Sequence, residues 1–104
     1  MGDVVLEQMK QLAERWWVYI LRCADGSLYT GIAKDADRRL VQHNAGKASR
    51  YTRSRLPVTM EYREEQPNHG FALTRELEIK ALSRQAKEDL IQLHVQTRSV
   101  TEET

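Results

Sequence analysis

The sequence predicts an α+β domain in which helices flank a small hairpin-based sheet, with an extra helix at the N-terminus. Three observations favour this class. An apolar strand-like segment runs directly into a hairpin signal, an alternating strand-like segment follows later, and segments with helical spacing stand before, between and after the strands. The length of 104 residues fits a single domain with one hydrophobic core.

Residues 1–15 predict an amphipathic helix, because Val5, Leu6 and Met9 recur at helical spacing opposite charged side chains. We treat this segment as an extension of the domain. We expect the helix either to pack on the sheet or to mediate self-association.

Trp17–Cys23 is apolar at both alternating sets of positions, which is typical of a central strand covered on both faces. Asp25 and Gly26 form a strong hairpin signal, because both residues tolerate positive φ. Leu28–Ile32 is then the returning antiparallel strand.

Asp35 is suited to cap the next helix, and Gly46 is suited to end it. We expect this helix to turn Leu40 and Val41 inward. The following segment, Lys47–Leu56, is interpreted as a polar, basic loop.

Val58–Arg63 alternates as a third strand, Phe71–Leu82 fits a helix, and Ser83 is placed to cap a last helix. The expected organisation is an extension over residues 1–15, a domain over 16–96 and a frayed polar tail over 97–104. The apolar residues that fit the first of these helices are Phe71, Ala72, Leu73, Leu77, Ile79 and Leu82. On the last helix, the residues expected on the buried side are Ala86, Leu90, Ile91 and Leu93.

The composition excludes global disorder, a membrane-spanning segment and a disulfide within the chain, because Cys23 is the only cysteine. We expect a cytoplasmic protein with Cys23 as a packed, reduced thiol.

Charge is concentrated in residues 34–63, where eight basic and three acidic side chains give a net charge of +5. This segment is either a surface for a polyanion or a solvated loop. The residues proposed to contact nucleic acid are Lys34, Arg38, Lys47, Arg50, Arg53, Arg55 and Tyr51. The ring of Tyr51 would stack on an unpaired base or pack on the domain.

Five residues are candidates for phosphodiester hydrolysis. Arg39 and His43 share one helix face at i and i+4, Tyr19 and Tyr29 lie on paired strands, and Glu76 offers a carboxylate for Mg²⁺. Each has a structural alternative: tyrosines as core packing, Arg39 and His43 as a solvated face, and Glu76 in an ion pair four residues along its helix.

The order and spacing of these residues resemble the GIY-YIG nuclease family. The matching segments are Val18-Tyr19-Ile20, Tyr29-Thr30-Gly31, Arg39, His43-Asn44 and Glu76. Further motifs, Gly46 to Thr52, Leu56-Pro57-Val58 and Glu76 to Arg84, are similar to its small single-domain bacterial branch, the YhbQ-like or UPF0213-type proteins.

The resemblance implies a three-stranded antiparallel sheet flanked by helices and one divalent ion, Mg²⁺ or Mn²⁺, held by Glu76. Tyr19 would act as or position the general base, Tyr29 would orient water and phosphate, Arg39 would stabilise the transition state, and His43 would contact the phosphate or assist proton transfer. Many members of the family have a lysine directly after the second triplet, where this chain has Ile32.

The leading hypothesis is therefore a metal-dependent endonuclease, selective for structure or single strands, with DNA favoured over RNA and a role in DNA repair or processing. One alternative is a nucleic-acid-binding module with weak turnover on the same scaffold. Another is a protein-interaction domain whose basic loop meets an acidic partner.

Overall fold

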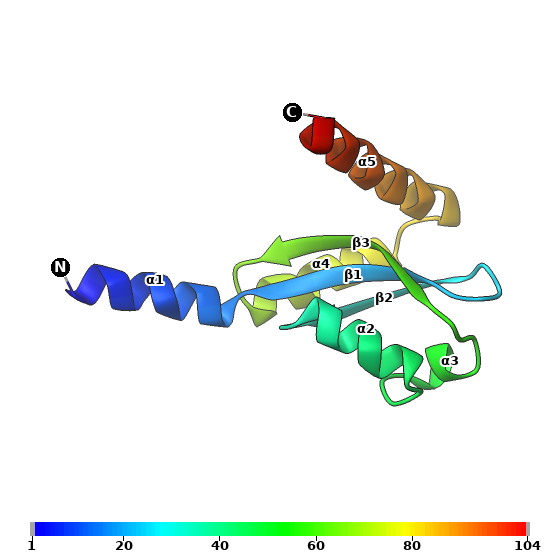
Figure 1. The fold of residues 1–104 in the computed structure, drawn as a ribbon, viewed down its shortest axis with the longest axis horizontal. Coiled ribbons are helices and arrows are strands. Elements are labelled where there is room, and N and C mark those ends of the chain that lie inside the picture. The colour runs from blue at the N-terminus through cyan, green and yellow to red at the C-terminus, as the bar shows by residue number, and fades with distance from the viewer. Residues whose placement is uncertain (1, 104) are drawn as a thin grey trace.

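The computed structural model describes residues 2–103, and the side chains of residues 3–10 and 13–97. They form a three-stranded antiparallel sheet with helices on both faces (Figure 1). The elements in chain order are α1 (Gly2–Glu14), β1 (Trp16–Arg22), β2 (Leu28–Ala33), α2 (Ala36–Asn44), α3 (Arg50–Arg53), β3 (Thr59–Gln66), α4 (His69–Lys80) and α5 (Arg84–Glu103).

The strand order β2-β1-β3 confirms that the most apolar strand is central. Alternate residues of β1 serve two cores. Val18 and Ile20 join an apolar cluster completed by α4 and α5, whereas Tyr19 and Leu21 join a second cluster that includes Leu40 of α2. The two faces of one strand are therefore packed against different helices.

The turn and cap signals of the sequence are confirmed. Gly26 has a φ of +85° in the hairpin, and Gly46 has a φ of +75° just beyond α2. The carboxylate of Asp35 accepts a hydrogen bond from the first turn of α2, and the Ser83 hydroxyl accepts one from the Ala86 backbone at the start of α5. Cys23 is a buried free thiol.

Two of the residues expected to face the core are exposed: Val41 of α2 and Leu93 of α5. In α4, Ala72 and Ile79 are buried and provide its contact with the core. The apolar residues around them that remain exposed are Phe71, Leu73, Leu77 and Leu82.

The N-terminal helix does not pack on the sheet as one expectation held. It projects beyond one end of the sheet (Figure 1), and Val5, Leu6 and Met9 are each more than half exposed. Self-association through α1 stays a prediction.

Three other boundaries differ from the sequence expectations. The segment expected as a loop contains the single turn α3, β3 continues to Gln66, and α5 continues through Glu103 where a frayed tail was expected. Residue 104 of that tail lies outside the described residues, as does residue 1 of the extension. Across residues 2–103, none of the helices combines the length and apolarity needed to cross a bilayer.

Candidate active site

Tyr19 is a phenol buried at the centre of the sheet. It lies on β1 directly opposite Gly31 of β2, and only 1% of its surface is exposed. A Cβ atom added at residue 31 would lie 2.6 Å from the Tyr19 hydroxyl oxygen. Glycine at this position therefore provides the space that the phenol occupies.

His43 lies at the inner side of α2 and links this phenol to α3. Its Nε2 atom is 2.9 Å from the Tyr19 hydroxyl, and its Nδ1 atom is 2.8 Å from the Thr52 hydroxyl. The His43 side chain is fully buried. A solvated helix face is therefore the wrong description of His43, since both ring nitrogens are hydrogen-bonded inside the protein.

Burial sets the protonation of this pair. Desolvation raises the pKa of Tyr19 to about 12, although the neighbouring Arg39 guanidinium opposes that rise. Desolvation, followed by the positive charge of Arg39, lowers the pKa of His43 to about 4. At neutral pH the pair consequently consists of a neutral phenol and a neutral imidazole.

Arg39 lies one helical turn before His43, beside the same phenol. Its Nη1 atom donates to the Gln42 side chain at 3.1 Å. Its Nε atom is buried and has no hydrogen-bond partner among the described residues. A buried cationic donor without a partner is costly, and an anionic ligand would satisfy it.

Tyr29 completes the aromatic part of the site. Its ring contacts His43 edge-on, with centroids 5.3 Å apart, and stacks on Tyr51 with centroids 6.1 Å apart. The guanidinium of Arg55 lies 3.9 Å from the Tyr51 ring centroid. These contacts favour the packing interpretation of Tyr51 over stacking on an unpaired base.

Glu76 of α4 reaches the electrostatic surroundings of the site, because its charge contributes to the raised pKa of Tyr19. Its side chain is 16% exposed and pairs with Lys80 at 3.4 Å. The ion pair of the structural alternative is thus present, and the charge of Glu76 is the smallest of the named contributions to the pKa of Tyr19.

A divalent ion fits this donor set in one way. The described residues contain no cluster of three or more His, Cys, Asp or Glu side chains that could enclose a metal. Mg²⁺ is commonly held by one or two carboxylates and completes its shell with water and substrate phosphate oxygens. A single carboxylate such as Glu76 is compatible with an open Mg²⁺ site of that kind. The described residues do not provide the several ligands that would enclose a metal on all sides.

The residues predicted to contact nucleic acid differ in how far they are engaged within the protein. Arg55 pairs with Asp25 at 3.1 Å and also donates to the Tyr51 carbonyl oxygen, so it holds the hairpin and α3 together. Lys34 and Arg38 line a hollow at the start of α2, which also includes Arg39. The exposed basic side chains of the set are Lys34, Arg38, Lys47, Arg50 and Arg53.

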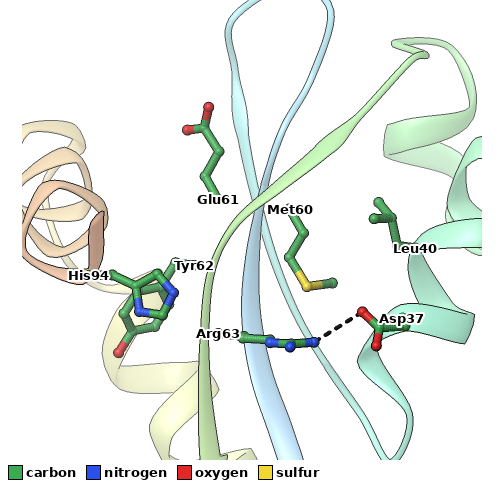
Figure 2. Close-up of a pocket in the computed structure, with 7 residues that line it drawn as sticks. All are labelled: Asp37, Leu40, Met60, Glu61, Tyr62, Arg63 and His94. Atoms are coloured by element: carbon green, nitrogen blue, oxygen red, sulfur yellow. Dashed lines mark hydrogen bonds and ion pairs between the residues drawn. The ribbon is translucent and has the colours of Figure 1, made fainter. Parts of the chain in front are cut away.

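A different hollow, of about 410 Å³, lies between α2, β3 and α5 (Figure 2). Arg63 donates to Asp37 across it, and Tyr62 and His94 pack ring against ring on its other side. None of the five candidate catalytic residues lines this hollow. It is separate from the site built around Tyr19.

The sequence did not predict the structural roles of Thr52 and Asn44, which hold α2 and α3 in place around the site. Thr52 is fully buried against His43 within the segment interpreted as a polar loop. Asn44 exchanges two hydrogen bonds with the backbone of Val58, which ties the end of α2 to the start of β3. The serine before a short helical turn, Ser49, was the available signal, because its hydroxyl caps α3.

The chain belongs to the GIY-YIG family, whose catalytic-domain model matches residues 15–89. Relatives confirm its placement in the UPF0213 branch. A UPF0213 protein of Staphylococcus saprophyticus is 47% identical over 78 residues, which cover 75% of this chain and 95% of the relative. A UPF0213 protein of Streptococcus sanguinis is 51% identical over 71 residues, with 68% and 82% covered.

Two solution NMR structures have a similar fold. A UPF0213 protein from Bacillus halodurans is 44% identical, with a TM-score of 0.50 over 76% of this chain and 84% of that protein. A protein from E. faecalis is 33% identical, with a TM-score of 0.53 and coverage of 79% and 88%. The three-stranded sheet with flanking helices is therefore shared with solved relatives.

Proposed function

We propose that this protein is a metal-dependent endonuclease that hydrolyses phosphodiester bonds, with DNA favoured over RNA as its substrate. The observation that carries the proposal is the buried hydrogen bond between Tyr19 and His43, with the partnerless Nε atom of Arg39 beside it. This arrangement lies within a chain of the GIY-YIG family. It provides a proton acceptor and a cationic donor at one place.

Tyr19 and His43 act together in the proposed proton transfer. Their pKa values, about 12 and about 4, make transfer from phenol to imidazole strongly unfavourable in the resting protein. Tyr19 is therefore a neutral phenol in the resting protein. The Tyr19 oxygen accepts a proton from the attacking water while its own proton passes to Nε2 of His43.

Arg39 is the proposed partner of the phosphate. Its unused Nε donor would bind a phosphoryl oxygen, and its charge would stabilise the negative charge that grows there during attack. Tyr29, packed edge-on against His43, would orient the water and the phosphate. Both side chains contribute mainly by positioning and charge.

Glu76 is the residue proposed to hold the divalent ion, Mg²⁺ or Mn²⁺. When bound, the ion supplies positive charge to the phosphate and to the leaving oxygen. Lys80, which pairs with Glu76 at 3.4 Å, would have to release the carboxylate or share it. Lys80 is half exposed, and an ion pair between residues four apart on a helix contributes only about 0.3 to 0.5 kcal/mol, which is weak enough for such an exchange.

The exposed basic residues Lys34, Arg38, Lys47, Arg50 and Arg53 are proposed to follow the nucleic-acid backbone. In the part of the chain that the structure describes, these side chains are spread over the segment before α2, α2 itself, the α2–α3 connection and α3, and do not lie along one helix that could enter a major groove. We therefore propose that the substrate is selected by structure or strand state, for example single strands, flaps or branched DNA. Repair or processing of DNA is the corresponding role.

The test is a panel of labelled single-stranded, duplex, flap, branched and RNA substrates with Mg²⁺ or Mn²⁺. Cleavage is expected from the wild-type protein and is expected to fall by at least about 100-fold in Arg39→Ala and Glu76→Gln. Two matched variants serve as controls: Glu78→Gln on the same helix, and Arg15→Ala, an exposed arginine paired with Glu65. Equal cleavage by Glu76→Gln and Glu78→Gln would contradict the proposal.

One observation favours a second candidate, a nucleic-acid-binding module with little turnover. Ile32 occupies the place of the lysine that many family members use, so the cation expected to favour a Tyr19 phenolate is missing there. Binding that weakens steeply with salt, without product from any substrate in the panel, would identify this candidate.

A further inference from the structure

The imidazole of His43 is held from both sides by groups that are shielded from water. Its Nε2 atom meets the Tyr19 hydroxyl at 2.9 Å, and its Nδ1 atom meets the Thr52 hydroxyl at 2.8 Å. His43 and Thr52 both have 0% of their surface exposed. With no bulk water at either nitrogen, the two hydroxyl partners decide which nitrogen carries the proton.

A backbone carbonyl group at the start of α3 orients the Thr52 hydroxyl. Thr52 Oγ1 donates a hydrogen bond to the carbonyl oxygen of Ser49 at 3.3 Å. A hydroxyl group has one proton to donate. Once that proton is directed to Ser49, Oγ1 meets the His43 ring as an acceptor, which requires a proton on Nδ1.

We propose that Thr52 is a positioning residue that keeps the His43 proton on Nδ1, leaving the Nε2 lone pair to accept the hydroxyl proton of Tyr19. The tautomer follows from the hydrogen bonds alone, whereas its catalytic consequence rests on the proposed function. The single turn α3 thereby acts on Tyr19 through the ring of His43.

The opposite tautomer would disable this arrangement. With its proton on Nε2, His43 would donate to the Tyr19 oxygen and could no longer take a proton from it. The proposed tautomer also tolerates the protonated ring, since Nδ1–H continues to donate to Thr52 while Nε2–H then donates to Tyr19. Thr52 therefore accepts the hydrogen bond from Nδ1–H both before and after the His43 ring receives a second proton.

The direct test is long-range ¹H–¹⁵N NMR of the His43 ring in the full chain, which distinguishes protonated from unprotonated ring nitrogens. We expect wild type and Thr52→Ser to carry the proton on Nδ1. Thr52→Val, which has nearly the same shape but no hydroxyl, is expected to lose that preference and move the proton toward Nε2. Thr59→Val, at an exposed position of β3, is the matched control.

Cleavage provides the second measurement. The rate is expected to fall about tenfold or more in Thr52→Val and to stay within about threefold of wild type in Thr52→Ser and Thr59→Val. A wild-type ring protonated on Nε2, or an unchanged Nδ1 tautomer in Thr52→Val, would overturn the inference. If Thr52→Val does not fold, the wild-type and Thr52→Ser tautomers still decide.

The two proposals fail in different ways. If the wild type carries the Nδ1 proton but cleaves no substrate in the panel, the tautomer assignment stands and the proposed function fails. If the wild type cleaves with its proton on Nε2, the function stands and the role of Thr52 is refuted.

Discussion

The two faces of strand β1 are built on opposite principles. Val18 and Ile20 point into a cluster of apolar side chains from α4 and α5, and both are fully buried. Tyr19, between them in the sequence, points into the other face and enters a chain of hydrogen bonds through His43 to Thr52. One strand thus supplies a hydrophobic core and a candidate reaction centre by simple alternation.

The difference between the two faces shows where burial stabilises this fold and where the burial of polar atoms destabilises it. On the α4 face, burial of apolar surface is favourable at every position. On the α2 face, each buried polar atom has to find a partner, and Arg39 Nε has none among the described residues. We expect substitutions of the buried apolar residues on the first face to act on unfolding, and substitutions of Tyr19, Arg39 and His43 on the second to act on chemistry.

The largest stability effect is expected for Ile20→Ala. Removing a fully buried Ile side chain from the apolar face should lower the free energy of unfolding by about 2 to 5 kcal/mol. Urea unfolding followed by circular dichroism measures this change. Cleavage per folded molecule should stay near the wild-type value, and a specific loss of rate in fully folded Ile20→Ala would break the comparison.

A smaller effect is expected from pH, and it arises on the polar face. The pKa of His43 is about 4 in the folded protein, against 6.5 for an ordinary histidine, so the unfolded chain takes up the proton first as pH falls. Stability should therefore decline from pH 6.5 toward pH 4, by about 2 to 3 kcal/mol in total. Unfolding curves of wild type and His43→Gln across this range measure the contribution.

Between pH 4.5 and 6.5, the contribution of His43 to stability can be measured separately from that of Glu88, a carboxylate with a shifted pKa. Hydrogen bonds from Arg22 lower the pKa of Glu88 to about 2, so its contribution is lost only as pH falls below its ordinary value of 4.5. Between pH 4.5 and 6.5 the wild type should lose stability and His43→Gln should lose less. Parallel curves over that interval would contradict the description of the polar face.

The sequence predicted the sheet well because its signals are local. The apolar run of β1, the hairpin at Gly26 and the caps at Asp35 and Ser83 each depend on a few neighbouring residues. Which apolar residues of α4 are buried was not predicted, because the choice between Ala72 and Leu77 as the inward residue depends on how closely the helix approaches the sheet. That distance is a tertiary property.

The sequence named the candidate catalytic residues that lie together in the structure, but it did not predict the residue that holds His43 in place. Tyr19, Arg39 and His43 are brought together, with Tyr29 against His43 and the charge of Glu76 within reach of Tyr19. The burial and role of Thr52 were not predicted, although it ends a motif shared with the family branch, because a four-residue helix leaves almost no periodic signal and a threonine among basic residues suggests a solvated loop. Its burial arises from the packing of α3 against α2.

The measurement that tests the central claim most directly is the cleavage rate of Tyr19→Phe on the best substrate of the panel. The substitution removes one hydroxyl and keeps the ring that packs on the sheet. The rate is predicted to fall by at least about 100-fold while circular dichroism shows the variant folded. A folded Tyr19→Phe protein that cleaves within about twofold of wild type would contradict a reaction centre built on this face of β1.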